Sequence, residues 1–524
     1  GSQNVAVGTG ALNAQNFTSA TDSYNTAVGR SAGVSVTTGQ VNTLIGGLAG
    51  DALTDADYNI AIGAHALSSD TLGSKSIAIG YNALFTQNFT SATDSNNVAI
   101  GWQAGLLVTT GTHDTLIGSE AGTSNTTGGD NVALGSVSLS TNTTGSNNVA
   151  VGRSALEKNT TSANNTAVGY QAAYSNTTGT PTTAFGYKAL KANTTGTNNC
   201  AFGQGTLQTN VSGTTNSAFG TIALSANTGT GNTAVGYASL LTNIGGANNV
   251  AMGVSALRLN TTASGNTAVG YLAGDNVTTG ANNTFVGSYC GGATDDGAQN
   301  TAVGMTALNS GNCGNSNTAI GCGALEACTG GNNTALGLDA GTSVTSGSNN
   351  TFIGLNAGVT GSPGGNITTG SNTIGLGNVS IASLSCQVSL TATSDMRDKT
   401  DFKDLDLGLA FVKELKPVTY VWDKRADYGD VTAEDFDLSS ITPDGTHKDD
   451  DLQVGFKAQE VIALEDAAGY KLSDKTNLTA TITADGKQYG LMYERFIPIL
   501  VKSIQELSAK NDALEARITA LEGN

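Results

Sequence analysis

Charged, aromatic and proline residues are scarce in this chain. Only 12% of its 524 residues are charged and 6% are aromatic, and there are five prolines against 70 glycines. Average globular domains have about 25% charged residues, so this composition is typical of disorder or of a repeated architecture. No apolar run approaches the roughly 18 residues that a membrane-spanning helix needs.

The few charges are unevenly placed, and they exclude two kinds of partner. Residues 394–524 carry 16 basic and 26 acidic side chains, whereas the first 393 residues carry 7 and 15. The net charge of −18 argues against nucleic acid and anionic membranes as partners, because both are bound by clustered lysine and arginine. We therefore expect a near-neutral fibre followed by an acidic module.

Cysteine and histidine are too few and too scattered for a metal or cofactor site. The six cysteines show neither metal-binding nor redox spacing. We expect most of them to be small buried residues, and Cys313 with Cys328 is the one candidate disulfide pair. His65, His113 and His447 lie far apart. The sequence therefore predicts no metal and no cofactor.

A repeat dominates the chain instead. A unit of the type Asn-Thr-Ala-Val-Gly-x-x-Ala-Leu, followed by a polar Asn-Thr-Thr-Gly stretch, recurs 22 times between Gly8 and Gly375. Of the 21 gaps between successive anchor glycines, 16 are 17 residues, three are 21 and two are 16. Disordered segments keep no such register, whereas stacked structural units do. The repeat predicts a parallel β-solenoid with one unit per turn over residues 1–375, and a β stalk or linker over 376–393.

Three columns of the repeat indicate how a turn packs. The residue before each anchor glycine is large and apolar, and the one before that is alanine in 17 units. Because neighbouring strand residues point to opposite faces, we expect both faces of this strand to be buried. Asparagine stands four residues before the glycine in 18 units, where stacked amides can hydrogen-bond from turn to turn. The glycines suit a tight corner with positive φ.

The repeat also indicates an oligomer. A core of one valine and one leucine per turn is thin for a coil that must order about 17 residues. The missing burial is then expected between chains, most simply in a homotrimer. The Asn-x-Ala-Val/Ile-Gly units resemble the head repeats of trimeric autotransporter adhesins, which implies the same trimeric architecture.

Six aromatic residues each directly follow an anchor glycine. Exposed aromatic rings are what a sugar-stacking surface needs, so we interpret them as candidate glycan-binding residues; the alternative is packing between turns. They are Tyr81, Trp102, Tyr170, Tyr187, Tyr237 and Tyr271.

Residues 394–524 have an α+β pattern. An amphipathic helix pattern over 405–415 ends before Pro417, a strand pattern follows over 418–422, and 454–461 leads into a second helix. The last helix has an a/d heptad, which predicts a coiled coil over 497–521; its positions are Ile497, Leu500, Ile504, Leu507, Asn511, Leu514, Ile518 and Leu521. Isoleucine at a with leucine at d would by itself favour two strands.

The module opens with the stretch Ser394-Asp395-Met396-Arg397-Asp398-Lys399. This Ser-Asp-x-Arg-x-Lys spacing, the Gly-Phe-x-Ala-Gln-Glu-Val segment at 455–461 and the closing helix resemble the self-cleaving intramolecular chaperone domain of phage tailspikes such as endosialidases. The resemblance implies an α+β chaperone domain that ends in a three-stranded coiled coil. It also implies a Ser–Lys dyad that cuts its own chain between Thr393 and Ser394.

The residue types fit that chemistry. A serine hydroxyl is a weak nucleophile until a base takes its proton, and a lysine can be this base if desolvation or a nearby cation lowers its pKa. Ser394 and Lys399 are therefore the candidate nucleophile and base. Arg397 is a candidate for lowering the lysine pKa or for binding the oxyanion, and Asp395 for orienting either residue. The alternative is an ordinary turn; no other enzymatic activity is expected.

Together these features predict a homotrimeric phage tail fibre or receptor-binding shaft. It would assemble in the host cytoplasm, become part of the virion tail and bind a host cell-surface receptor, with a glycan as the expected ligand. One alternative is a bacterial trimeric cell-surface adhesin built from the same repeats. Another is a polysaccharide-degrading tailspike, which would need paired carboxylates in a groove. The only adjacent pair in the repeats, Asp295-Asp296, fits a turn better.

Overall fold

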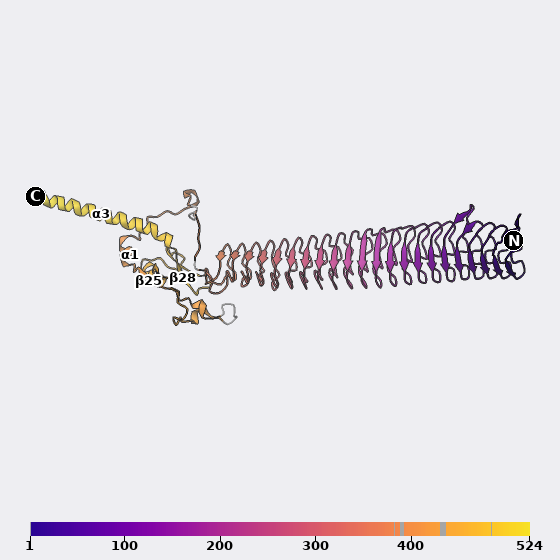
Figure 1. Cartoon of the computed structure of the whole chain (residues 1–524). Coiled ribbons are helices and arrows are strands. Elements are labelled where there is room, and N and C mark those ends of the chain that lie inside the picture. Colours follow the sequence, from indigo (N-terminus) through magenta and orange to yellow (C-terminus); the bar gives the residue numbers. More distant parts are fainter. Residues whose placement is uncertain are drawn as a thin grey trace. The chain divides into compact units, whose positions relative to one another are not determined.

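The computed structural model describes residues 2–381, 383–387, 392, 394–429, 436–483 and 485–523. It divides into two compact units, Gly1–Asn312 and Cys313–Asn524. The first unit is a parallel β-solenoid; the second contains further turns of the same type and a mixed module that ends in a long helix (Figure 1). The predicted mainly β solenoid with turns of about 17 residues is confirmed for the single chain.

In the first unit, short strands stack in parallel at intervals of one turn. Between β2 and β3, for example, Ala27 pairs with Leu44 and Val28 with Ile45. Within residues 2–312 only β5 and β7 lie outside this ladder, and they pair with each other. The strands are β1 (Val5–Val7), β2 (Thr26–Val28), β3 (Thr43–Ile45), β4 (Ile60–Ile62), β5 (Gly73–Ser74), β6 (Ile77–Ile79), β7 (Thr93–Asp94), β8 (Val98–Ile100), β9 (Thr115–Ile117), β10 (Val132–Leu134), β11 (Val149–Val151), β12 (Thr166–Val168), β13 (Thr182–Phe185), β14 (Asn199–Phe202), β15 (Ser217–Phe219), β16 (Thr233–Val235), β17 (Val250–Met252), β18 (Thr267–Val269), β19 (Thr284–Val286) and β20 (Thr301–Val303).

The strand residues before the anchor glycines divide between the inside and the outside of the coil. From β2 on, the alanine column points inward and is fully buried, as at Ala27 (0% exposed). The large apolar residue after it points outward, and Val28 is 36% exposed. The expectation of a coil core of one valine and one leucine is therefore wrong, because the strand alternates faces and turns its alanine inward. Alanine and leucine fill the coil.

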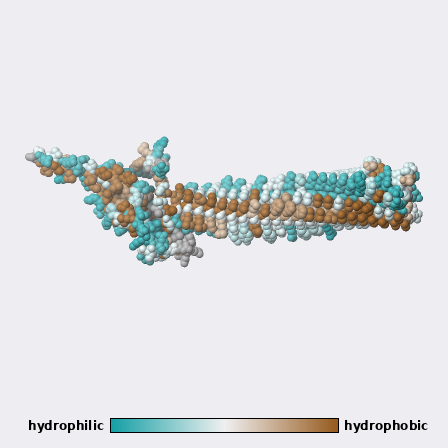
Figure 2. Space-filling model, viewed as in Figure 1, coloured by the Kyte–Doolittle hydropathy of each residue, from teal (hydrophilic) through white to brown (hydrophobic). Residues whose placement is uncertain are grey.

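The outward residues form an apolar stripe along the solenoid, visible as a brown band in Figure 2. We call it the outer stripe. In the first unit it consists of the last residue of each strand in the ladder: Val7, Val28, Ile45, Ile62, Ile79, Ile100, Ile117, Leu134, Val151, Val168, Phe185, Phe202, Phe219, Val235, Met252, Val269, Val286 and Val303.

The predicted asparagine column exists and is buried. The backbone N–H of Asn42 donates to Oδ1 of Asn25 in the preceding turn (2.8 Å). Its own Nδ2 donates to the carbonyl of Ala56 in the following turn (2.8 Å). Each buried asparagine therefore satisfies its backbone N–H on the preceding turn and its side-chain amide on the following turn, so it needs a turn on both sides.

A second asparagine column escaped the sequence analysis. It runs inside the turns from Asn125 to Asn260, and each Nδ2 donates to the Oδ1 one turn earlier, as Asn142 does to Asn125 (2.8 Å) and Asn159 to Asn142 (2.8 Å). These residues are the asparagines of the Asn-Thr-Thr-Gly stretch. Their signal was visible in the repeat, where the stretch stands out only as polar.

The anchor glycines are required by two constraints at once. Gly46 has a φ of 139°, a conformation that side-chain-bearing residues rarely adopt. In addition, a Cβ on Gly46 would lie 2.4 Å from the carbonyl oxygen of Gly63 in the next turn. The corner therefore stacks backbone directly on backbone.

Where a large residue replaces the inward alanine, small residues make room for it. Leu116 lies between Gly105 and Gly122, which occupy the position of the usual inward leucine in their turns. An added Cβ on Gly105 would lie 2.9 Å from Leu116 Cδ1, and one on Gly122 would lie 2.7 Å from Leu116 Cδ2. Glycines flank Leu44, Phe285 and Phe352 in the same way. The irregular turns therefore keep the inner volume constant, as close packing requires.

The second unit begins with a ladder formed by β21 (Thr318–Ile320), β22 (Thr334–Leu336), β23 (Thr351–Ile353) and β24 (Ile374–Leu376). In the last pairing Phe352 lies opposite Gly375 and Ile353 opposite Leu376. Gly377, with a φ of 66° and its amide donating to the Ile353 carbonyl (2.7 Å), takes the anchor position. Assigning Gly375 as the last anchor is therefore wrong, because the longer loop after β23 shifts the register.

The described residues between 378 and 387 form no strand in the single chain. The predicted β stalk over 376–393 consequently stays a prediction, and part of it lies outside the described residues.

The module after residue 393 contains one small core, formed by Leu407, Phe411, Val461, Phe496 and Ile499. Strand β25 pairs antiparallel with β26, and β27 with β28. The elements are η1 (Met396–Asp398), α1 (Leu409–Glu414), β25 (Val418–Tyr420), η2 (Arg425–Tyr428), η3 (Leu438–Ser440), β26 (Gln453–Gly455), α2 (Ala458–Ala467), β27 (Ala480–Ile482), β28 (Tyr489–Leu491), η4 (Tyr493–Arg495) and α3 (Phe496–Glu522).

Because a large inward residue is compensated by flanking glycines, a second substitution should restore the stability that a first one removes. Leu116→Ala leaves a cavity and should lower the free energy of unfolding by about 3–5 kcal/mol. Gly122→Leu alone should also destabilise, because Leu116 fills that space. Together they should restore most of the stability, since Leu139 holds the same position one turn later with a φ of 51°.

Thermal unfolding of the four proteins in a Ser394→Ala background measures this coupling. Additive losses in the double variant would contradict the account.

Asp114 predicts a pH effect. It replaces one asparagine of the first column and accepts hydrogen bonds from Asn131 N (2.9 Å) and Asn125 Nδ2 (2.9 Å). Burial raises the pKa of Asp114 to about 7, well above its value in an unfolded chain. The stabilisation that its protonated form provides should therefore be present below about pH 4 and be lost as the pH rises through 7.

Relative to Asp114→Asn, the wild-type midpoint of thermal unfolding should fall between pH 4 and pH 8. The exposed neighbour Asp130 supplies a second variant: its negative charge adds to the rise in the pKa of Asp114, so Asp130→Asn should keep the direction of the pH dependence and reduce its size. An unchanged pH dependence in Asp114→Asn would refute the assignment.

Candidate self-cleavage site

The Ser-Asp-x-Arg-x-Lys stretch folds into one tight turn. Asp395 caps the short helix η1, because its Oδ1 accepts from the backbone N–H of Arg397 (2.9 Å). At the other end the N–H of Lys399 donates to the Met396 carbonyl (3.2 Å), and the chain becomes extended again. Aspartate at such a cap is favoured because its short side chain reaches the backbone two residues on.

This turn brings the predicted nucleophile and base together. Lys399 Nζ lies 2.5 Å from Ser394 Oγ and donates to it, and it lies 3.4 Å from the Ser394 carbonyl oxygen. A base must lie within about 3.2 Å of the group whose proton it takes, and 2.5 Å is inside that reach. Since the two residues are only five apart, the local turn is sufficient to form the dyad.

The other two predicted site residues pair with each other. The Arg397 guanidinium contacts the Asp395 carboxylate through Nη2 (2.6 Å) and through Nε (3.1 Å). These hydrogen bonds hold the pKa of Asp395 below its usual value and raise that of Arg397. Within the described residues neither side chain bonds to the side chain of Ser394 or Lys399. Asp395 therefore shapes the turn and holds Arg397 beside the dyad.

The site is open to solvent in the single chain. Ser394 and Lys399 are both exposed, and the Arg397 side chain is 85% exposed. Thr393, the predicted acyl side of the cut, lies outside the described residues.

The Gly-Phe-x-Ala-Gln-Glu-Val segment has a packing role near the start of α2. The N–H of Phe456 donates to the Tyr493 hydroxyl (3.1 Å), and the Phe456 ring stacks on Phe496 with 5.4 Å between centroids. A Cβ on Gly455 would lie 2.3 Å from that hydroxyl, so only glycine fits. The resemblance identified this segment from the sequence, but its partner lies 37 residues away and leaves no local pattern.

Another residue missed by sequence reasoning is Glu506. The N-cap residue of α1, Gly408, has no side chain to cap the helix. Glu506 of α3 supplies the cap instead, since its Oε2 accepts from the N–H of Leu409 (2.8 Å). No local pattern around 408 could have revealed this tertiary cap.

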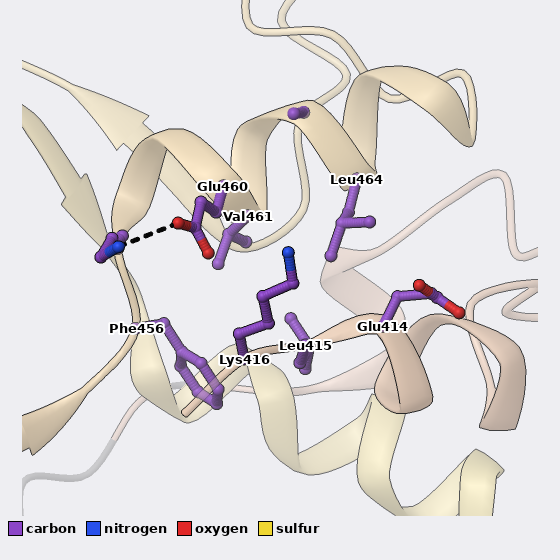
Figure 3. A pocket seen from close by; sticks show the side chains of 9 residues that line it. Glu414, Leu415, Lys416, Phe456, Glu460, Val461 and Leu464 are labelled. Atoms are coloured by element: carbon purple, nitrogen blue, oxygen red, sulfur yellow. Dashed lines mark hydrogen bonds and ion pairs between the residues drawn. The ribbon is translucent and has the colours of Figure 1, made fainter. Parts of the chain in front are cut away.

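A hollow of about 220 Å³ lies between the end of α1 and α2 (Figure 3). Leu415, Phe456, Val461 and Leu464 form its apolar walls, and the Lys416 side chain points into it. Neither Ser394 nor Lys399 lines it. The hollow is therefore separate from the dyad.

The six candidate glycan-binding aromatics are all exposed on the solenoid surface, by between 40% (Tyr170) and 55% (Tyr237). Tyr170 and Tyr187 stack in adjacent turns, 5.5 Å between centroids. They form no single site, because Tyr81 and Trp102 lie many turns before Tyr237 and Tyr271.

Asp295 and Asp296 have the turn role expected of them. The Asp295 side chain accepts from the Thr278 hydroxyl, its N–H donates to Asn312 Oδ1 (2.8 Å), and Asn312 Nδ2 donates to Asp296 Oδ1 (3.1 Å). Both carboxylates thus stabilise loops between neighbouring turns.

Cys313 and Cys328 are buried free thiols. A hydrogen bond between them raises the pKa of Cys313 and lowers that of Cys328. The two predicted disulfide partners are therefore in contact without being bonded.

No group of three or more potential metal ligands occurs in the described part of the chain. Among the described helices, none combines the length and apolar character needed to cross a bilayer.

Comparison with known proteins identifies the module. The sequence model of the family described as chaperone of endosialidase matches residues 394–470. Neither a curated protein nor a solved structure matches the chain.

The match begins at Ser394, the predicted nucleophile. Domains of this family are intramolecular chaperones with autoproteolytic activity, typical of phage tail fibres and tailspikes, and they act in trimeric fibres. The chain therefore carries a chaperone of endosialidase domain in its C-terminal part, preceded by a long parallel β-solenoid.

Proposed function

We propose that this chain is the shaft of a phage tail fibre whose C-terminal module aligns three copies and then cuts itself off before Ser394. The observation that carries the proposal is the 2.5 Å contact between Lys399 Nζ and Ser394 Oγ, at the first residue of the matched chaperone domain. The fibre assembles in the host cytoplasm and becomes part of the virion.

The proposed cut is a single turnover in cis. Lys399, in its neutral form, takes the proton of Ser394 Oγ, which adds to the carbonyl carbon of Thr393. The C–N bond of that peptide then breaks as the Ser394 nitrogen takes up a proton, leaving an ester between Thr393 and the serine oxygen. Water hydrolyses the ester, releasing a Thr393 carboxylate and a module that starts with Ser394. Arg397 is the candidate for stabilising the oxyanion.

Assembly has to switch this chemistry on. An ammonium group in water keeps its proton at neutral pH, and only desolvation or a nearby cation lowers the lysine pKa enough for it to act as a base. In the single chain Lys399 is exposed. Covering the turn with a neighbouring copy would remove water from it, so that cleavage follows association of the chains.

The last helix supports a homotrimer. Phe496, Ile499 and Ser503 of α3 are buried against the module. The a/d heptad residues remain exposed, among them Ile504 by 66% and Leu507 by 55%. An apolar heptad stripe without a partner on its own chain is the pattern of a coiled coil formed between copies.

The outer stripe supports the same assembly. Its residues are apolar along the whole first unit, yet Phe185 and Phe219 are each 41% exposed and stack on Phe202 with 5.2 Å between centroids. Contiguous exposed apolar surface of this kind marks an interaction site. Packing three stripes together would bury the area that one coil leaves uncovered.

Binding of a host glycan is the remaining part of the proposed function. The exposed aromatics of the solenoid, such as Trp102 (47%) and Tyr237 (55%), have accessible rings. A ring of this kind can stack on the apolar face of a sugar, and the repeated turns would present several along the fibre.

The cut site can be tested directly. The purified wild-type protein should yield a fragment of residues 394–524, identified by N-terminal sequencing that begins at Ser394. Ser394→Ala and Lys399→Ala should each leave a full-length chain that still trimerises. Lys399→Arg should also stay uncut, because arginine keeps the positive charge but does not deprotonate.

The exposed lysine nearby provides the control variant, Lys403→Ala, which should cut normally. A fragment that begins elsewhere, or normal cutting in either dyad variant, would remove the assignment.

The chaperone role predicts that folding history matters. Residues 1–393 expressed alone should aggregate, because unguided repeats pair out of step and expose solenoid edges. The same residues released by cutting after folding should form a trimer that resists heat. Leu507→Asp with Leu514→Asp should act like the truncation by burying charge at two core positions.

Ala509→Asp with Ala516→Asp is the matched control, since it adds the same charge at the same spacing on α3 but off the heptad stripe. Sedimentation analysis reads out the oligomer. A well-behaved trimer from residues 1–393 alone would show that the repeats find their own register.

A further inference from the structure

One column of side chains on the solenoid surface has a gap. The position five residues after the anchor glycine holds Arg258, Asp275, Gly292 and Asn309 in four successive turns. Because Gly292 has no side chain, a hollow of about 190 Å³ opens between its two neighbours in the column. It is lined by Leu272, Asp275, Asn276, Tyr289, Gly292, Ala293 and Asn309.

An aromatic ring forms one wall of the hollow. Tyr289 is 42% exposed, and it packs edge-to-face against Tyr271, 5.3 Å between centroids and 82° between planes. The ring is therefore held in place while one of its faces stays accessible.

The polar lining is also held in place. Arg258 Nε and Nη2 donate to the two oxygens of Asp275 (2.8 and 2.9 Å). Each carboxylate oxygen keeps further acceptor capacity, because an ionised carboxylate has about four lone-pair sites. The amides of Asn276 and Asn309 add both donors and acceptors.

We propose that this hollow binds one neutral pyranose ring of a host-surface glycan. Tyr289 stacks on the apolar face of the ring, Asp275 accepts hydrogen bonds from its hydroxyls, and the two amides bond to the remaining polar groups. A small concave site with an aromatic wall and a few oriented polar groups is the usual form of a ligand site. Its volume lies below the roughly 300 Å³ at which sites for drug-sized ligands begin, which favours a single ring.

The charges decide between neutral and acidic sugars. The cation next to the hollow, Arg258, is already paired with Asp275. An acidic sugar would bring a second carboxylate close to Asp275, and like charges at short range repel. The inference rests on the proposed function of host attachment and specifies where on the fibre the glycan binds.

Saturation-transfer NMR on the full-length protein tests the inference, with glucose, galactose, mannose, N-acetylglucosamine and N-acetylgalactosamine as probes. At least one of them should bind. Gly292→Asn should reduce the signal at least 10-fold, because the new side chain fills the gap in the column. Asparagine is already present at the equivalent position of the next turn, Asn309. The φ of Gly292 is not positive, and the nearest atom to an added Cβ is the mobile end of Asn309, so asparagine can be accommodated.

Tyr289→Ala should reduce the signal to the same extent by removing the wall without filling the hollow. Tyr58→Ala, which removes another exposed ring (57%) that lies outside the hollow and is not one of the six candidate aromatics, should bind like wild type. Absence of binding for all five sugars, or binding that persists in both hollow variants, overturns the inference.

Self-cleavage and trimer formation, measured on the same samples, report on the proposed function separately. A fibre that assembles and cuts normally but binds none of the five sugars would refute the proposed sugar site without affecting the proposed shaft and chaperone roles.

Discussion

Turn-to-turn hydrogen bonding between buried amides is the constraint on which the solenoid depends. Asn42 needs Asn25 on one side and the Ala56 carbonyl on the other, and each amide along the column has the same need. An unsatisfied buried amide costs about as much as several hydrogen bonds contribute, since each contributes only around 1 kcal/mol net. Each turn therefore has to stack its asparagine on the one before, and the pairing persists across the two turns of 16 residues. Longer gaps are tolerated where the extra residues leave the coil as loops.

The same regularity creates a problem for assembly. A copy displaced by one turn along the outer stripe would meet nearly the same apolar residues, so a misaligned trimer would lose little contact energy. The irregular residues that could mark a unique register, such as Leu116 and Phe285, are fully buried inside their own coil. Another chain therefore cannot contact them and cannot use them to find the correct register. A separate module that aligns the copies at one end would supply the missing reference, and removing it afterwards would leave a fibre whose stability is kinetic.

In the proposed mechanism, geometry and activation are separated at the cleavage site. A six-residue turn already holds Lys399 against Ser394, so no assembly is needed to build the dyad. Exposure keeps this lysine hydrated, so assembly is needed to make it a base. Such a division would protect a chain that has not yet found its partners. The ion pair between Asp395 and Arg397 fits this division, because it stabilises the turn that holds Lys399 against Ser394.

Periodicity alone determined the parallel solenoid, its buried asparagines and its glycine corners, because each turn repeats one set of local contacts. The hexad at 394–399 likewise determined that Lys399 contacts Ser394, because five residues of separation leave few ways to turn. Only the tertiary structure decided which strand face points inward, since alternation by itself does not say which face is the inside. It also decided the register at Gly377, the cap that Glu506 places on α1 and the hollow beside Gly292. Each of these depends on residues that meet across turns or across distant segments, and such contacts leave no local pattern in the sequence.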